Sequence, residues 1–152
     1  MDLKKLNPNE IYDFRNLIEI FKEVFESADE VPNDHHLAKL LSNQDFVVFV
    51  VKIDNKVVGG LTLYVLQSYY NVKPMAYIYD VGIATNYQGR GLGKALIAKA
   101  YDFCNTSGFE VAFVQAEDSD TNAIDFYRKT NPTNEMIARH FTYSFMVKPR
   151  EF

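Results

Sequence analysis

The sequence contains a single cysteine, Cys104, among its 152 residues. One cysteine excludes an intrachain disulfide and is typical of a protein that works in a reducing cytoplasm. No run approaches the roughly 18 apolar residues that a membrane span needs. The first residues, Met1 to Lys5, lack the apolar stretch of a secretory signal. We therefore expect a cytoplasmic protein that has no membrane partner.

Linkers, repeats and an excess of positive charge are also missing. No tract is rich in Gly, Ser or Pro, so residues 1–152 are interpreted as one domain. The composition is 47% apolar and 24% charged, which is typical of a globular protein. A net charge of −4 disfavours a nucleic-acid partner and favours a cationic ligand. His35, His36 and His140 have neither the spacing nor the companions of a metal site, so no metal is expected.

Hydrophobic periodicity predicts a mixed α/β sheet with the element order βααβββαβαβ. Apolar residues spaced by three and four from Ile11 to Phe25 form one face of a helix. The β-branched and aromatic run from Phe46 to Ile53 predicts a strand that is covered on both faces. Strands are predicted over 3–6, 46–53, 57–66, 75–84, 109–116 and 137–147, and helices around 11–25, 34–41, 92–107 and 121–129.

The segment from Gln88 to Lys94 lies between a predicted strand and an amphipathic helix, and it reads QGRGLGK. Alternate glycines let a ligand approach the main chain, and the N–H groups of a helix's first turn attract anions. This pattern predicts a phosphate or pyrophosphate cradle, although a flexible glycine-rich turn would also explain it. Lys94 is followed by Ala95, which excludes a P-loop, and the third glycine comes one residue too early for a dinucleotide fingerprint.

The pattern Gln-x-x-Gly-x-Gly at 88–93, after a strand that ends near Ala84, resembles the acetyl-coenzyme A signature of the GNAT superfamily of N-acetyltransferases. The element order is similar to that fold over nearly the whole chain. Short stretches at 64–66, 77–80 and 115–116 are similar to the small aminoglycoside 3-N-acetyltransferases. The resemblance implies the GNAT acyl-CoA N-acyltransferase fold, in which central strands splay apart and helices flank the sheet.

The resemblance also implies a site for the co-substrate acetyl-coenzyme A. The backbone of Val81, Gly82 and Ile83 would pair with the pantetheine arm as though it were a strand, where the splayed strands open. The pyrophosphate would be held by the N–H groups of the loop, namely Gln88, Gly89, Arg90, Gly91, Leu92 and Gly93.

The segment from Ala123 to Tyr127 resembles the family motif whose tyrosine faces the leaving thiolate of coenzyme A. A phenol can donate a proton to that sulfur, so the resemblance makes Tyr127 the catalytic acid. A core tyrosine that anchors the last helix is the structural alternative. Two departures from the family occur nearby: Asp120 replaces a frequent asparagine, and Thr130 to Pro132 replaces a usual Gly-Phe pair.

The acceptor ammonium must lose a proton before it attacks, and carboxylates supply the candidate bases. Asp80 interrupts an otherwise apolar run, and an unpaired charge is costly to bury, so it is expected to line a cleft. Pairing with a lysine or arginine at the strand end is the alternative. Asp120 is the second candidate base, with Glu117 and Asp118 as substrate-binding groups. This acidic run could instead be a solvated loop and a helix N-cap.

A second acidic patch runs from Glu23 to Asp34 and includes Glu26 and Asp29. In the family this region covers the acceptor side, so both residues are predicted to bind a cationic substrate. A solvated face is the ordinary explanation for such a patch.

Taken together, the residues and the resemblance predict an enzyme that transfers acetyl directly from acetyl-coenzyme A to an amine. The favoured acceptor is the 3-amino group of an aminoglycoside. The alternatives are a polyamine, another small amine or a protein amine, and a non-catalytic acyl-coenzyme A sensor. A homodimer could form if an edge strand such as 137–147 paired across two copies.

Overall fold

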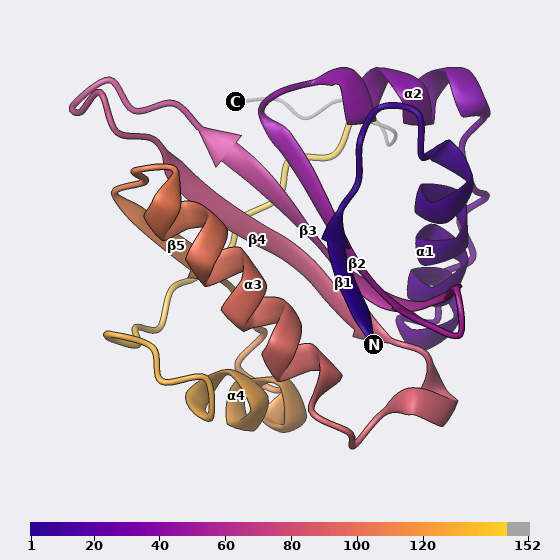
Figure 1. Cartoon of the computed structure of the whole chain (residues 1–152). Coiled ribbons are helices and arrows are strands. Elements are labelled where there is room, and N and C mark those ends of the chain that lie inside the picture. The colour runs from indigo at the N-terminus through magenta and orange to yellow at the C-terminus, as the bar shows by residue number, and fades with distance from the viewer. Residues whose placement is uncertain (146–152) are drawn as a thin grey trace. The chain divides into compact units, whose positions relative to one another are not determined.

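The chain is described here from a computed structural model over residues 1–145. These residues form a five-stranded sheet in the order β1-β2-β3-β4-β5 (Figure 1). The strands are β1 (Asp2–Lys5), β2 (Phe46–Ile53), β3 (Lys56–Leu66), β4 (Met75–Ile83) and β5 (Val111–Val114). The first three pairings are antiparallel, and β5 runs parallel to β4. The predicted mixed α/β sheet is therefore confirmed.

The helices begin and end close to their predicted positions. They are α1 (Ile11–Val24), α2 (Asp34–Ser42), α3 (Leu92–Thr106) and α4 (Thr121–Arg128), with a short 3₁₀ turn, η1, at Thr85–Tyr87. Asn33 caps α2 because its side chain accepts the N–H of His36 at 3.0 Å. At the β2–β3 hairpin, Asp54 and Asn55 adopt φ of 51° and 62°, the left-handed pair that a tight hairpin turn requires.

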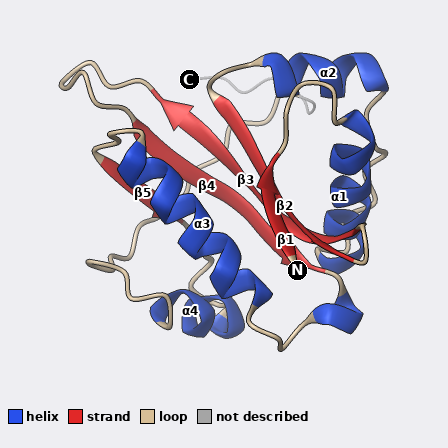
Figure 2. Ribbon diagram, viewed as in Figure 1, coloured by secondary structure: helices blue, strands red, loops and turns tan. Residues whose placement is uncertain are grey.

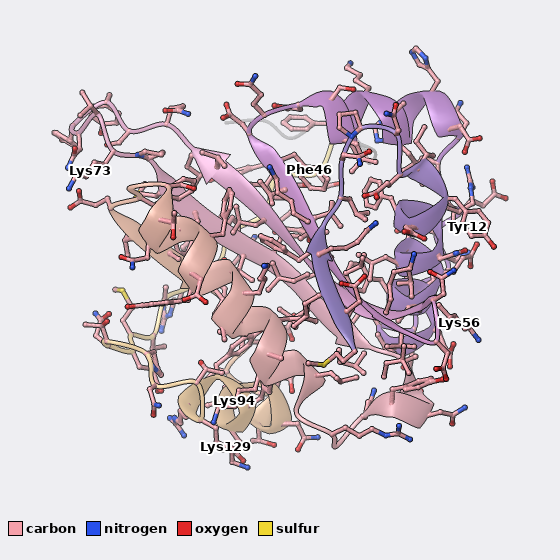
Figure 3. All side chains as sticks on the ribbon, viewed as in Figure 1. Tyr12, Phe46, Lys56, Lys73, Lys94 and Lys129 are labelled. Carbon is pink, nitrogen blue, oxygen red and sulfur yellow. The ribbon has the colours of Figure 1, made fainter. Side chains whose placement is uncertain are left out.

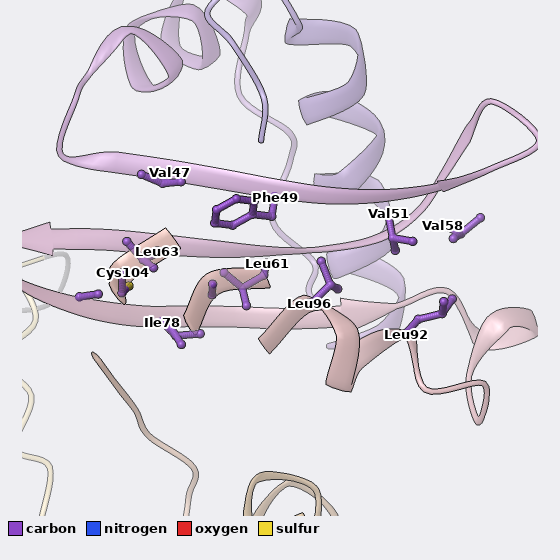
Figure 4. Close-up of a cluster of buried hydrophobic side chains, with 12 residues drawn as sticks. Val47, Phe49, Val51, Val58, Leu61, Leu63, Ile78, Leu92, Leu96 and Cys104 are labelled. Atoms are coloured by element: carbon purple, nitrogen blue, oxygen red, sulfur yellow. The ribbon is translucent and has the colours of Figure 1, made fainter. Parts of the chain in front are cut away.

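Helices cover both faces of this sheet (Figure 2). Helix α3 packs Leu92, Leu96 and Cys104 onto Leu61, Leu63 and Ile78 of the strands (Figure 4). Helices α1 and α2 cover the opposite face, where Phe14, Leu17 and Leu37 pack on the even-numbered side of β2. Strand β2 is buried on both sides as its unbroken apolar run predicted.

Cys104 lies inside the α3 core, and burial raises the pKa of its thiol to about 11. The thiol is therefore protonated at neutral pH, which agrees with a packed side chain and not with a nucleophile.

Two strand predictions need correction. Strand β5 spans only Val111–Val114, shorter than the expected 109–116. The predicted last strand, 137–147, is absent from its described part, because residues 137–145 carry no strand pairing; residues 146 and 147 lie outside the described residues. Alternating apolar residues favour a strand, but a strand exists only where a neighbour satisfies its backbone groups. Ile137 and Phe145 instead are 79% and 92% exposed.

By its internal contacts the chain divides into one unit, Met1–Gln115, and a second that begins at Ala116. The first unit contains the whole sheet with α1, α2 and α3, and the second contains α4. No described helix is long and apolar enough to cross a membrane.

Candidate active site

The edge of β4 that faces β5 opens halfway along the strand. Pairing with β5 ends at Ile78 opposite Val114, although β4 continues to Ile83. On the other edge, the N–H of Ala84 donates to the carbonyl of Val58 at 2.8 Å. Since backbone groups alternate in direction along a strand, Val81 and Ile83 point their N–H and C=O groups toward the open edge. The splayed strands expected from the sequence are thus present.

A glycine-rich loop follows this open edge and leads into α3. Gly91 is the N-cap of the helix and adopts φ 79°, and Gly89 adopts φ 76°, so both positions require the left-handed region. In the described part of the chain, the N–H groups of Gly89 to Gly93 donate to no other backbone group outside the helix. Those of Gly91 to Gly93 are the orphan donors of the helix start, in a region where the helix dipole is positive.

The side chains of the loop stabilise the turn. Gln88 donates from its side-chain amide to the carbonyl of Ile83 at 2.9 Å, and its own N–H donates to Thr85 at 3.3 Å. Arg90 donates to the carbonyl of Asn86 at 3.2 Å and lies over the ring of Tyr87. Lys94, at the start of α3, is exposed (Figure 3). Gln88 thus joins the loop to the open strand edge. We call Val81–Ile83 together with Gly89–Gly93 the coenzyme edge.

A β-bulge in β4 decides where Asp80 points. Thr62 of β3 pairs with Asp80 and Leu63 pairs with Ile78, so Tyr79 is an extra residue without a partner. Strict alternation would place Asp80 on the same face as Ile78, in the α3 core. The bulge moves it to the opposite face. There its N–H donates to the hydroxyl of the buried Thr62 at 3.3 Å.

The Asp80 carboxylate is half-buried and has no cation in contact. The four ion pairs in the described part of the chain are Lys4–Glu10, Arg15–Asp34, Lys52–Asp13 and Arg128–Glu135, and none involves Asp80. Burial raises the pKa of this carboxyl above its ordinary value. The alternative prediction of a strand-end pair with lysine or arginine is therefore not observed, and the carboxylate can accept an ammonium from a ligand.

Tyrosine rings lie on the same face of the sheet as Asp80. Tyr79 packs edge-to-face against both Tyr64 and Tyr77, at centroid distances of 5.5 Å and 5.6 Å. Burial, followed by the charges of Tyr79 and Asp80, raises the pKa of Tyr64. The aromatic neighbours of Asp80 were not predicted as site residues; the Tyr-x-Tyr-Asp spacing at 77–80 was their signal. We call Thr62, Tyr64, Tyr77, Tyr79 and Asp80 the acceptor face.

The sequence profile of the acetyltransferase (GNAT) family matches residues 14–131. The chain belongs to the GNAT acetyltransferase family. It is accordingly an acyl-CoA-dependent N-acetyltransferase.

Solved structures agree with this assignment. The chain is similar to an aminoglycoside acetyltransferase from an uncultured soil metagenomic sample, crystallised with sisomicin, at 46% identity over 95% of both chains with a TM-score of 0.92. A second metagenomic soil aminoglycoside acetyltransferase is 28% identical over 94% of this chain and 98% of its own, with a TM-score of 0.84. Aminoglycoside N-acetyltransferase AAC(6′)-Iy in complex with CoA shares the fold, with 17% identity over 94% and 93% of the two chains and a TM-score of 0.74.

GNAT enzymes use acetyl-CoA, and the residues of the coenzyme edge fit such a ligand. Among the described residues the N–H groups of Gly89 to Gly93 have no backbone partner outside α3, which suits a pyrophosphate, and the open edge of β4 offers donors and acceptors to an amide-containing arm. A Cβ built on Gly91 would meet nothing within 4 Å, so the space beside the loop is open. The Cβ of a residue at Gly82 would lie 2.8 Å from the ring of Phe21, so α1 packs directly on β4 at that point.

The remaining GNAT site candidates lie on the second unit. Asp120 is the N-cap of α4, where its carboxylate accepts the N–H of Ala123 at 3.0 Å, so the capping alternative is observed for this residue. Glu117 and Asp118 precede it in an exposed turn. Tyr127 lies in the last turn of α4, with its ring against Phe126 at 5.0 Å. Their catalytic and binding roles stay predictions.

The acidic patch lies where the sequence predicted it, at the end of α1 and in the loop to α2. Glu26 and Asp29 are exposed in that loop, and Glu26 adopts a left-handed φ of 54°. Asp34 is paired with Arg15, so one charge of the patch is already compensated. In the described part of the chain no group of three or more His, Cys, Asp or Glu side chains could hold a metal.

Proposed function

We propose that this acetyltransferase acts on an aminoglycoside, at the 3-amino group of the deoxystreptamine ring, by direct attack of the amine. The observation that carries the proposal is the half-buried Asp80 carboxylate, which lacks a cation and lies one residue before the open strand edge at Val81. An ammonium bound there would be next to the edge that receives the acetyl donor. The 46% identical relative, an aminoglycoside acetyltransferase crystallised with sisomicin, supports the same acceptor class.

In this proposal each group has a distinct task. The coenzyme, when bound, supplies an activated acetyl group as a thioester. The loop N–H groups hold its phosphates, and the backbone of Val81 and Ile83 orients its arm. Asp80 accepts the proton of the incoming ammonium, and its raised pKa brings its basicity closer to that of a working general base. Tyr127 donates a proton to the leaving sulfur.

Asp120 is the second candidate for the base, and the N-cap bond distinguishes it from Asp80. Its carboxylate already accepts a backbone N–H, whereas Asp80 has no partner for its carboxylate among the described residues. Glu117, Asp118, Glu26 and Asp29 are proposed to attract the polycationic acceptor, because an acidic surface raises the local concentration of cations.

The test is a thiol-release assay with purified enzyme and acetyl-CoA against sisomicin, gentamicin, spermidine and a lysine peptide. We expect turnover on the two aminoglycosides, and mass and NMR analysis of the product should place the acetyl group on the 3-nitrogen. Expression in a sensitive bacterium should raise the minimum inhibitory concentration of gentamicin. If only spermidine or only the peptide is acetylated, the proposed aminoglycoside acceptor is wrong, and the acceptor is a polyamine or a protein amine. Coenzyme binding without turnover on any amine would favour a sensor.

Asp80→Asn provides the matched residue test, with Asp120→Asn beside it. We expect Asp80→Asn to lower kcat/KM for the acceptor by about 10²–10⁴, the usual contribution of a positioned general base, and to abolish the rise of rate with pH. Coenzyme binding should not change. If Asp120→Asn, and not Asp80→Asn, loses the pH dependence, the base is Asp120.

A further inference from the structure

Two tyrosine rings of the acceptor face are exposed and are not buried in the core. Tyr79 is 55% exposed and Tyr64 is 38% exposed, although both belong to central strands of the sheet. Helix α1 covers β4 at Gly82, where it packs on the backbone, but Tyr77 and Tyr79 precede that contact in the strand. Contiguous exposed aromatic side chains on a sheet face are typical of a binding surface.

The rings are held in place before any ligand arrives. Tyr77 stacks on Phe113 at 4.8 Å with an interplanar angle of 12°, and its hydroxyl donates to the side chain of Gln115 at 2.8 Å. Tyr64 packs against Phe46, which belongs to the core under α1 and α2. Tyr79 lies between Tyr64 and Tyr77 in two edge-to-face contacts. A ring fixed on both sides loses little entropy when it binds a ligand.

The bulge that positions Tyr79 interrupts the pairing of β3 and β4. As the extra residue, Tyr79 has no partner on β3, so the regular pairing of β3 and β4 is interrupted where it projects. Asp80, the next residue, projects on the same face and has no cation among the described residues. One local distortion therefore presents an aromatic ring and an unpaired carboxylate together.

We infer that Tyr64, Tyr77 and Tyr79 form a platform for a saturated ring that bears ammonium groups, with Asp80 binding one of those ammoniums. This inference rests on the proposed function and assigns recognition of the acceptor's amino-bearing ring, as opposed to a linear polyamine, to these three tyrosines. The C–H face of a saturated ring packs on an aromatic surface over several carbons at once. A neighbouring ammonium adds cation–π attraction to the tyrosine faces.

Binding measurements test the platform independently of turnover. The enzyme is saturated with coenzyme A, which cannot donate acetyl, and is titrated calorimetrically with sisomicin and with spermidine. We expect Tyr79→Leu to raise the Kd of sisomicin about 5- to 30-fold, because the substitution removes both the packing of the saturated ring and a cation–π contact. The Kd of spermidine should change less than about threefold, since a flexible chain loses at most an exposed cation–π contact and has no ring packing to lose.

Two variants control the experiment. Tyr79→Phe keeps the ring and should bind sisomicin within about threefold of the wild type. Tyr101→Leu removes an exposed tyrosine of α3, on the opposite face of the sheet, and should not change either Kd. Because Tyr79 and Tyr101 are both exposed, all three variants should fold, which melting curves will check.

The outcomes separate the platform from the proposed function. If the wild type acetylates sisomicin but Tyr79→Leu binds it as the wild type does, the platform is wrong and the function stands. Equal weakening of sisomicin and spermidine also overturns the platform, because Tyr79 then senses charge alone. If sisomicin binding depends on Tyr79 but no deoxystreptamine amine is acetylated, the platform stands and the function fails. Absence of sisomicin binding to the wild type overturns both.

Discussion

The coenzyme edge and the acceptor face share strand β4, but they are built from different parts of the chain. The coenzyme edge presents backbone: the open groups of Val81 and Ile83 and the N–H groups of Gly89 to Gly93. The acceptor face presents side chains: one carboxylate and three tyrosines. A backbone site depends on conformation and tolerates changes of side chain, whereas a side-chain site depends on residue identity and on the face toward which each residue points.

The Tyr127→Phe substitution tests whether acetyl transfer needs a proton donor that belongs to neither region. We expect it to have the largest effect on activity among the changes considered below. The substitution keeps the ring and removes the proton donor, so kcat should fall by about 10²–10⁴ while the Kd values of coenzyme A and acceptor stay unchanged. Steady-state kinetics and calorimetry measure these quantities. A changed Kd with normal kcat would assign Tyr127 to one of the two binding regions.

Gly91→Val tests whether the coenzyme edge depends on conformation. A β-branched residue is strained at φ 79°, so the loop should shift and the KM for acetyl-CoA should rise about 10- to 100-fold. Arg90→Ala is the matched control, since it keeps the N–H and removes only a side chain folded over Tyr87; its KM should change about threefold or less. Normal coenzyme binding by Gly91→Val would contradict the phosphate cradle.

Salt should act mainly on the acceptor region, because its proposed interactions are charge pairs. We expect kcat/KM for sisomicin to fall at least about threefold between low and physiological ionic strength, as electrostatic steering is lost. Under the same conditions kcat/KM for a monoamine should change less. An equal salt response of both acceptors would remove the acidic surface from substrate recognition.

The smallest expected effect is a gain in stability from Asp80→Asn. Burial raises the pKa of Asp80, because it favours the protonated carboxyl in the folded protein. The free energy of unfolding therefore falls as the pH rises through the raised pKa and the carboxyl becomes charged. Asparagine removes the uncompensated charge. The melting temperature should therefore rise by about 2 °C at pH 7 and be unchanged near pH 3. Lower melting temperatures of the variant at neutral pH would show that the carboxylate is stabilised by a partner.

Local sequence signals were sufficient for most elements and for the position of the glycine loop before α3. The glycine-rich segment at 88–94 predicted a loop that leads into a helix, and Gly89 and Gly91 adopt positive φ there. The apolar run of β2 predicted burial on both faces, which is observed. Such features depend on the conformational freedom of single residues and on hydrophobic periodicity, which are written in consecutive residues.

The face to which Asp80 points, the length of β5 and the state of residues 137–145 were decided by tertiary structure. Alternation alone would bury Asp80 beside Ile78, and the bulge at Tyr79 becomes visible only when the register of β3 against β4 is known. Residues 137–145 have the pattern of a strand but no strand pairing in the described structure. The physical reason is common to these cases: pairing and register depend on hydrogen bonds between segments distant in sequence, so no local pattern can fix them.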